Sequence, residues 1–153
     1  MLQNAFTEAY AAFLRKTGME GDAAFQPDAN GSCDLVLGDV RVTFTCREDA
    51  PDDVYCHTAI ASLEGLEDEP GLLNDFLEAN FFWEGTAGAT LGIDSETKKL
   101  ILTDRREASY FQDGEVFASW IGAFVQNALS WREYVANYRA GTAADETETE
   151  VRK

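Results

Sequence analysis

The chain has 153 residues, of which 45% are apolar and 12% aromatic, and a formal net charge of −16. This length and composition predict one domain with a substantial core. The negative charge argues against nucleic acid and anionic membrane surfaces as partners, because their phosphate groups would repel it. No apolar run approaches the ~18 residues of a membrane span, and the start of the chain lacks the pattern of a signal peptide. Three cysteines at unrelated spacings do not suggest a disulfide framework, so we expect a cytoplasmic protein.

The first part of the chain predicts one helix followed by three strands. Residues 2–17 carry apolar side chains at helical spacing, and Gly18 is expected to end this helix. The turn Gly38-Asp39 lies between two segments in which apolar and polar side chains alternate, which predicts a β-hairpin. Residues 48–53 carry four acids and a proline, which predicts a loop. The predicted strands are residues 33–37, 40–46 and 54–63.

A second helix followed directly by three aromatic residues forms the middle of the sequence. Pro70 suits a first helical turn, because its missing N–H would have no intrahelical partner there, and Asn80 suits the end of the helix. One short helix does not need this much apolar surface, so either the rest of the domain or a second copy of the chain must cover it. We predict a homodimer whose interface is formed by Leu72, Leu73, Phe76, Leu77, Phe81, Phe82 and Trp83.

Two more strands and a long helix complete the chain. The strands are expected at residues 89–94 and 99–102, and Asp113 is expected to cap the last helix. Apolar side chains recur at steps of three and four from Val116 to Tyr138, so we expect one wide face of this helix to be core. Gly141 is expected to end it. The acidic, threonine-rich residues 142–153 are predicted to be a disordered tail to a domain of residues 1–141.

The sequence carries no pattern that is typical of a catalytic or metal site. His57 is the only histidine, and adjacent Cys56 would face the opposite side of a strand, so the two cannot easily form a nucleophile–base pair. Neither the glycine-rich phosphate loops nor the G-x-S-x-G motif is present. The carboxylates are scattered over predicted loops and helix faces. We therefore expect no enzymatic activity, no cofactor and no metal.

The middle segment and the order of elements together resemble a known family. Leu73 and Leu77 lead into the helix exit Ala79-Asn80-Phe81, and a Gly-x-x-Gly step at residues 85–88 leads into a hairpin. This pattern is similar to the helix-two motif and following strands of the class I type III secretion chaperones, the Tir-chaperone (CesT-like) family. The cluster of residues 81–83 is more aromatic than that motif requires.

The resemblance implies an α+β sandwich with the order α-β-β-β-α-β-β-α, which forms a homodimer and has no enzymatic activity. Such a chaperone binds the N-terminal region of a secreted effector in extended form and keeps it soluble and competent for secretion. The physical basis is sound, because an extended segment can add to a strand edge or lay apolar side chains into a groove. The net charge of −16 would help a protein with exposed apolar surface to stay soluble.

The first helix and the first strands are the expected binding region for an effector. Apolar residues at these spacings are usually core, so at least half of the candidates are expected to be buried. The candidate effector-binding residues are Phe6, Tyr10, Leu35, Leu37, Val42 and Phe44. Two other functions remain open: a chaperone-like domain with a cytosolic role in stress response or signalling, and a small hydrolase or ligand-binding enzyme that uses surface carboxylates.

Overall fold

The computed structural model describes residues 4–22, 26–28 and 32–151, with residues 143–151 as backbone only. The element order confirms the predicted α+β arrangement. Its helices and strands are α1 (Asn4–Thr17), β1 (Cys33–Leu37), β2 (Val40–Arg47), β3 (Ala50–Ser62), α2 (Pro70–Asn80), β4 (Thr90–Asp94), β5 (Lys99–Glu107) and α3 (Gly114–Val151). Short 3₁₀ turns lie at η2 (Leu66–Asp68), η3 (Phe81–Trp83) and η4 (Ala108–Tyr110).

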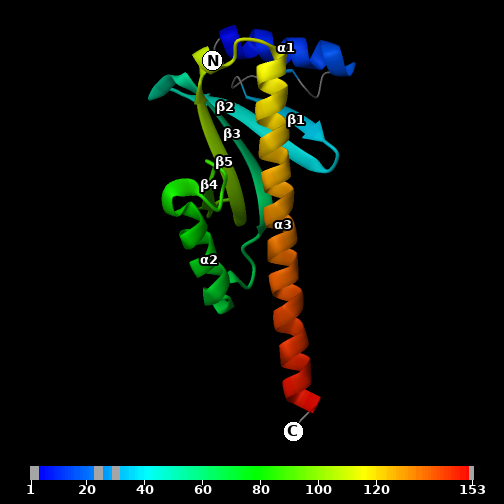
Figure 1. Ribbon diagram of the computed structural model, residues 1–153, viewed down its shortest axis with the longest axis vertical. Helices are drawn as coiled ribbons and strands as arrows, with labels where there is room; N and C mark the ends of the chain where they lie inside the picture. The colour runs from blue at the N-terminus through cyan, green and yellow to red at the C-terminus, as the bar shows by residue number, and fades with distance from the viewer. Residues whose placement is uncertain (1–3, 23–25, 29–31, 152–153) are drawn as a thin grey trace.

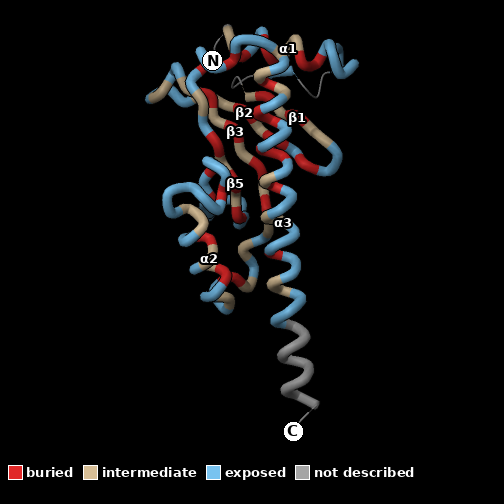
Figure 2. The backbone as a smooth tube through the Cα atoms, viewed as in Figure 1, coloured by how far each residue is buried: buried red, intermediate tan, exposed pale blue. Residues whose placement is uncertain are grey.

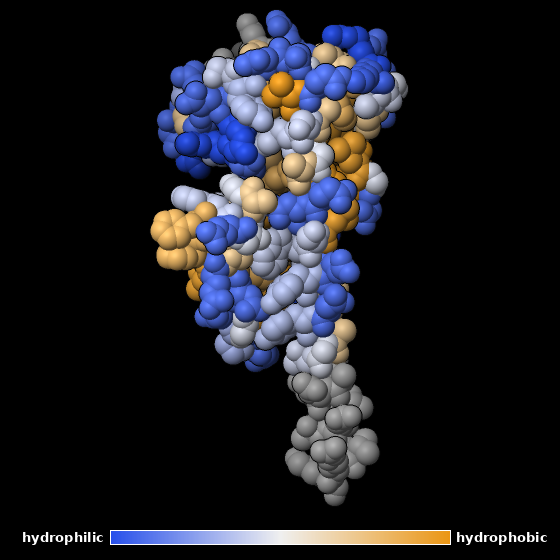
Figure 3. Space-filling view, in the orientation of Figure 1, coloured by the Kyte–Doolittle hydropathy of each residue, from blue (hydrophilic) through white to orange (hydrophobic). Residues whose placement is uncertain are grey.

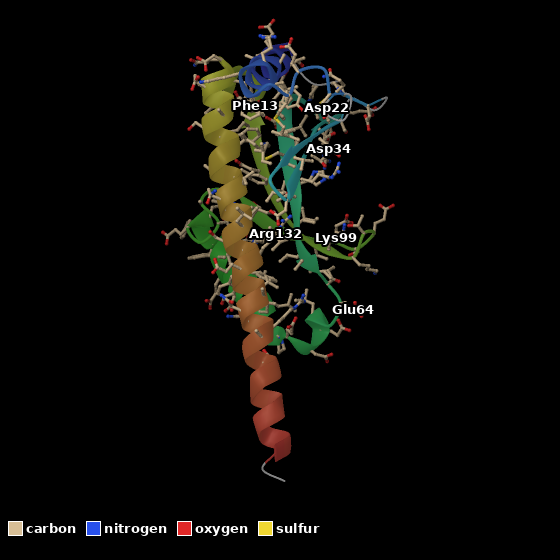
Figure 4. All side chains as sticks on the ribbon, turned by 90° about the vertical axis from the view of Figure 1, so that its right-hand side faces the viewer. Phe13, Asp22, Asp34, Glu64, Lys99 and Arg132 are labelled. Atoms are coloured by element: carbon tan, nitrogen blue, oxygen red, sulfur yellow. The ribbon has the colours of Figure 1, made fainter. Side chains whose placement is uncertain are left out.

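The five strands form one antiparallel sheet in the order β1-β2-β3-β5-β4, so β1 and β4 are its two edges. The long helix α3 runs along one face of the sheet, α1 crosses near its N-terminal end, and α2 lies beside its middle (Figure 1). Asp34 and Lys99 project from the side of the sheet away from α3 (Figure 4). We call the face towards α3 the inner face and the opposite one the outer face.

The alternation of side chains along the strands explains which face is buried. In β2, Val40, Val42 and Phe44 are fully buried on the inner face, whereas Arg41 is exposed on the outer face. The turn Gly38-Asp39 joins β1 to β2 as predicted, with Leu37 opposite Val40. Buried segments concentrate where the upper half of α3 crosses the sheet (Figure 2).

Aromatic rings fill the space between α1, the sheet and α3. Phe6 of α1 contacts Phe44 of β2 and Phe117 of α3, with ring centroids 5.3 and 5.8 Å apart. Phe117 is also 5.1 Å from the ring of Phe13. Aromatic pairs at these separations add to the hydrophobic stabilisation of the core. Trp120 and Phe124 are buried as predicted, whereas Trp131 is half-buried.

The buried carboxylate of Asp104 joins β5 to α3. Its Oδ2 accepts a hydrogen bond of 2.8 Å from Trp120 Nε1, and its Oδ1 accepts one of 2.8 Å from Arg106 Nη1. A buried charge is tolerated only when it is paired and hydrogen-bonded, and both conditions hold here. Elsewhere on α3, the guanidinium of Arg132 donates from Nε and Nη2 to the carbonyl of Ala59, at 3.1 and 2.9 Å.

The helix starts follow the predicted local chemistry. Pro70 is at the first turn of α2. Asp113 caps α3, because its Oδ1 accepts hydrogen bonds of 2.9 Å from the backbone N–H groups of Glu115 and Val116. At the end of α1, Gly18 has a φ of 71°, which glycine adopts without steric cost.

Two boundaries differ from the sequence prediction. Strand β3 begins at Ala50, not residue 54, because Arg47 lies opposite Ala50 and the turn is confined to residues 48 and 49. Pro51 is tolerated there, since pairing with β5 starts only at Asp53.

Helix α3 continues through Gly141 to Val151, so the predicted helix end is wrong. One glycine costs a helix only about 1 kcal/mol. The division at residue 141 stays a prediction.

We expect Trp120→Ala to lower the free energy of unfolding by about 3–5 kcal/mol, because it removes a large buried side chain from a packed site. The variant also leaves the Asp104 carboxylate without its indole donor. Urea unfolding measures the change. Leu129→Ala, at a partly exposed position of the same helix, is the control and should change the free energy by less than about 0.5 kcal/mol. Unchanged stability in Trp120→Ala would contradict the assignment of this face to the core.

Deletion of residues 142–153 should shift the melting temperature by no more than about 2 °C, because loss of a real core contact would shift it further. The deleted residues contain one sizeable apolar side chain, Val151. In Figure 1 the last turns of α3 extend past the sheet and α2. Circular dichroism during heating gives the measurement. A much larger drop would mean that this segment docks against the body of the protein.

Candidate protein-binding surfaces

The end of α2 and the turn after it expose several large apolar side chains. Leu77 is 72% exposed, Phe81 70%, Phe82 72% and Trp83 54%. We call these four residues the aromatic surface. The rings of Phe81 and Phe82 have centroids 4.4 Å apart. Figure 3 shows the apolar patch at the left of the view, over the segment that follows α2. A contiguous exposed patch of this kind is typical of a contact with another protein chain.

The rest of the predicted dimer face lies inside the protomer. Leu72 is fully buried, and Leu73 is half-buried. Phe76 is buried with its ring edge-on to Trp131 of α3, at a centroid distance of 5.8 Å. The assignment of Leu72 and Phe76 to a dimer interface is therefore corrected. The physical reason is that α2 packs between β4 and α3, which bury one side of the helix and leave Leu77 uncovered.

A second surface is a groove beside α1. It has a cavity volume of about 250 Å³. The buried side chains of Phe6, Tyr10 and Leu14 line it together with the exposed side chains of Thr7 and Pro27. We call this cavity the α1 groove. Apolar residues and a few polar groups at its rim are the usual lining of a site that holds side chains of a partner.

Among the described residues, no strand pairs with the outer side of β1, which is therefore an edge of the sheet next to the α1 groove. Leu37 and Val40 close a two-residue hairpin, so the N–H and C=O groups of Asp34 and Val36 point away from β2. The hydroxyl of Tyr10 donates to the carbonyl of Asp34 at 3.2 Å, which confirms this direction. Such an edge can accept a further strand.

The predicted effector-binding residues are mostly core. Leu35, Val42 and Phe44 have no exposed surface, so direct contact of these side chains with an effector is excluded in this structure. Phe6 and Tyr10 are also buried but line the α1 groove, and Leu37 is half-buried. The apolar alternation of β1 and β2 reports the inner face of the sheet, which α1 and α3 already cover. The sequence analysis missed two candidate effector-binding regions, the rim of the α1 groove and the edge of β1. It missed them because neither region shows a periodic pattern of apolar residues.

The outer face of the sheet has a polar cleft with a cavity volume of about 700 Å³. Its lining includes Arg41, His57, Lys99 and Arg132. Arg41 is paired with Asp34 at 2.7 Å, and burial lowers the pKa of His57. Asp39 and Asp94 also line the cleft, which is thus a polar surface of mixed charge.

The chemistry of the thiols does not favour catalysis. Cys56 is buried on the inner face, whereas His57 is half-buried on the outer face, as predicted. Burial raises the pKa of the Cys33 thiol to about 12, and that of Cys56 also rises, so neither supplies a thiolate near neutral pH. Within residues 4–22, 26–28 and 32–151, no cluster of three or more His, Cys, Asp or Glu side chains could hold a metal ion. Over the same described part of the chain, no helix is both long and apolar enough to span a membrane.

Comparison with solved structures identifies the fold. A chain of the ExsC–ExsE complex superposes with a TM-score of 0.67 at 18% identity, over 87% of this chain and 96% of the other. A chain of the HopA1–SchA chaperone–effector complex gives 0.63 at 16% identity, over 85% and 95%. The Yersinia pestis type III secretion chaperone SycH, in complex with a fragment of YscM2, gives 0.54 at 16% identity, over 80% and 98%.

Sequence comparison identifies the family. No curated protein matches the chain significantly. The sequence model of the Tir chaperone protein (CesT) family, by contrast, matches residues 11–132, which include the second half of α1, the whole sheet, α2 and the first half of α3. The chain therefore belongs to the Tir chaperone protein (CesT) family.

Proposed function

We propose that this protein is a type III secretion chaperone that binds the N-terminal region of an effector in extended form and keeps it soluble before export. Membership of the Tir chaperone family supports the function. Two of the similar structures, the HopA1–SchA chaperone–effector complex and the type III secretion chaperone SycH, agree with it. Because the cargo must be held before it is secreted, we place the chaperone in the cytoplasm. We assign it no enzymatic activity.

The observation that carries the binding mode is the free edge of β1 beside the α1 groove. An extended segment that pairs with β1 would form main-chain hydrogen bonds with Asp34 and Val36 and would place alternate side chains towards α1. The groove is lined by apolar side chains that could receive them. The segment needs no fold of its own, which suits a cargo that is held extended.

Val36→Pro tests the edge. Proline removes the outward N–H of Val36 and should leave the β1–β2 ladder intact. Loss of this one hydrogen bond, worth about 1 kcal/mol, should weaken effector binding about fivefold. The measurement is titration calorimetry with the N-terminal region of an effector encoded beside this gene. Val36→Thr keeps the N–H and is the control, and both variants should melt with the wild type. Unchanged affinity in Val36→Pro would contradict strand addition at β1.

We also propose that the chain forms a homodimer through the aromatic surface. Four exposed apolar side chains on a small monomer are costly to leave in water, and a second copy presents the same surface. An interface of this type is rich in aromatic residues at its centre. The surface lies at the β4 side of the sheet, and the β1 edge lies at the other side, so dimerisation leaves the α1 groove open.

Leu77→Asp combined with Phe82→Asp should convert the dimer to a monomer, because each Asp would bury an unpaired charge in the interface. Both side chains are more than two-thirds exposed in the protomer, so the melting temperature at low protein concentration should change little. Sedimentation equilibrium gives the mass. Tyr110→Asp changes an exposed aromatic residue in η4 and should remain dimeric. A wild-type chain that is monomeric at micromolar concentration would refute the dimer.

A further inference from the structure

The turn that presents the aromatic surface has an unfavourable backbone conformation. Phe82 has a φ of 52° and Trp83 a φ of 57°, both in the left-handed region. This region is unfavourable for a residue with a side chain, because Cβ comes too close to the following carbonyl oxygen. Consecutive aromatic residues are therefore a poor choice for such a turn. The exposed rings of Phe81 and Phe82 contact each other and gain little from the protomer.

Two local contacts hold the ends of this turn. The side-chain amide of Asn80 makes two hydrogen bonds with the backbone of Leu91, each 2.9 Å long. Asn80 Nδ2 donates to the carbonyl of Leu91, and Asn80 Oδ1 accepts from the N–H of Leu91. Gly85 packs directly on the backbone of α2. A Cβ atom at Gly85 would lie 2.8 Å from the Cα of Ala79, so no larger residue fits without a shift.

A third contact comes from α3. Thr86 is fully buried in the turn, and its hydroxyl donates to the carbonyl of Ala89. The carbonyl of Thr86 accepts a hydrogen bond of 2.6 Å from Nδ2 of Asn127. Asn127 is 41 residues away in the sequence. The same carbonyl also accepts a hydrogen bond of 3.0 Å from the N–H of Ala89. Without the Asn127 donor it would keep that local bond but lose its hydrogen bond to α3, which is unfavourable.

The ring of Trp83 reports the shape of the turn. The indole N–H of Trp83 donates to the hydroxyl of Thr90 at 3.2 Å. The backbone carbonyl of Trp83 accepts a hydrogen bond of 3.1 Å from the N–H of Gly88. The turn is thus held at both ends and at its centre, while the aromatic rings themselves point to solvent. Backbone strain that the surrounding structure maintains is a reason to look for a function.

We propose that Asn127 and Thr86 are positioning residues that hold Phe81, Phe82 and Trp83 in one fixed arrangement for docking of a second copy of this chain. The proposal rests on the homodimer of the proposed function. A turn that is already rigid loses less conformational entropy when the partner binds, so affinity rises without any new contact. Helix α3, which forms the core, thereby also sets the geometry of the dimer surface.

The test uses Asn127→Asp, which keeps the size of the side chain and removes the donor. Gln126→Glu makes the same chemical change at the adjacent, exposed position of α3 and is the control. We expect Asn127→Asp to raise the dimer dissociation constant about tenfold and Gln126→Glu to leave it unchanged. In a Phe82→Ala background, Asn127→Asp should weaken the dimer less than it does in the wild type, because one of the three rings that it positions is already absent.

The three tryptophan indole signals in a ¹H–¹⁵N spectrum provide a second readout. In Asn127→Asp, the Trp83 signal should move towards the position of a free indole. The Trp120 signal should stay in place, since its partner is Asp104. Gly85→Ala disturbs the same turn from the side of α2. It should also raise the dimer dissociation constant and move the Trp83 signal, so the test remains possible if Asn127→Asp does not fold.

The outcomes separate the two proposals. An unmoved Trp83 signal, or a dissociation constant equal to that of Gln126→Glu, would overturn the positioning role. Equal weakening by Asn127→Asp with and without the Phe82 ring would also overturn it, because a general loss of stability acts in both backgrounds. A monomeric wild-type chain would refute the dimer, and the docking role with it, whether or not the Trp83 signal moves.

Discussion

The fold depends on the burial of the aromatic face of α3 against the inner face of the sheet. Phe117 contacts α1 through Tyr10 and the sheet through Phe44, and Trp120 donates to the buried carboxylate of Asp104. The other helices are arranged around this contact, with α1 near the start of α3 and α2 beside its middle (Figure 1). Because the helices cover only one face, the outer face, the β1 edge and the end of α2 remain available to other chains.

The two proposed interfaces use opposite edges of one sheet. The α1 groove adjoins β1, and the aromatic surface adjoins β4 through the hydrogen bond from Trp83 to Thr90. A cargo segment and a second protomer can therefore bind at the same time without competing for surface. The net charge of −16 opposes the non-specific association that exposed apolar groups would otherwise cause.

Local features were the most predictable from the sequence, since each depends on a few neighbouring residues. The hairpin at Gly38-Asp39 and the cap at Asp113 are where local chemistry predicts them. Helix α2 also ends at Asn80 as predicted, but Asn80 keeps a right-handed φ of −74° and not the left-handed conformation on which the prediction is based. The start of β3 was less predictable, because pairing between distant strands decides how far a strand extends into an acidic segment. Helix α3 passes through Gly141 because a single glycine costs a helix only about 1 kcal/mol.

The sequence by itself determined the order of the elements, the apolar stripes of the helices and the family resemblance, because these follow from periodicity and local chemistry. Only the tertiary structure decided which stripe is covered. Leu72 and Leu77 belong to the same leucine pattern, yet one is fully buried and the other is 72% exposed. Strand order likewise made β1 and β4 the outermost strands, and chain folding brought Asn127 to the turn at Thr86. Such contacts join residues that are far apart in the sequence, so the local pattern of residues does not predict them.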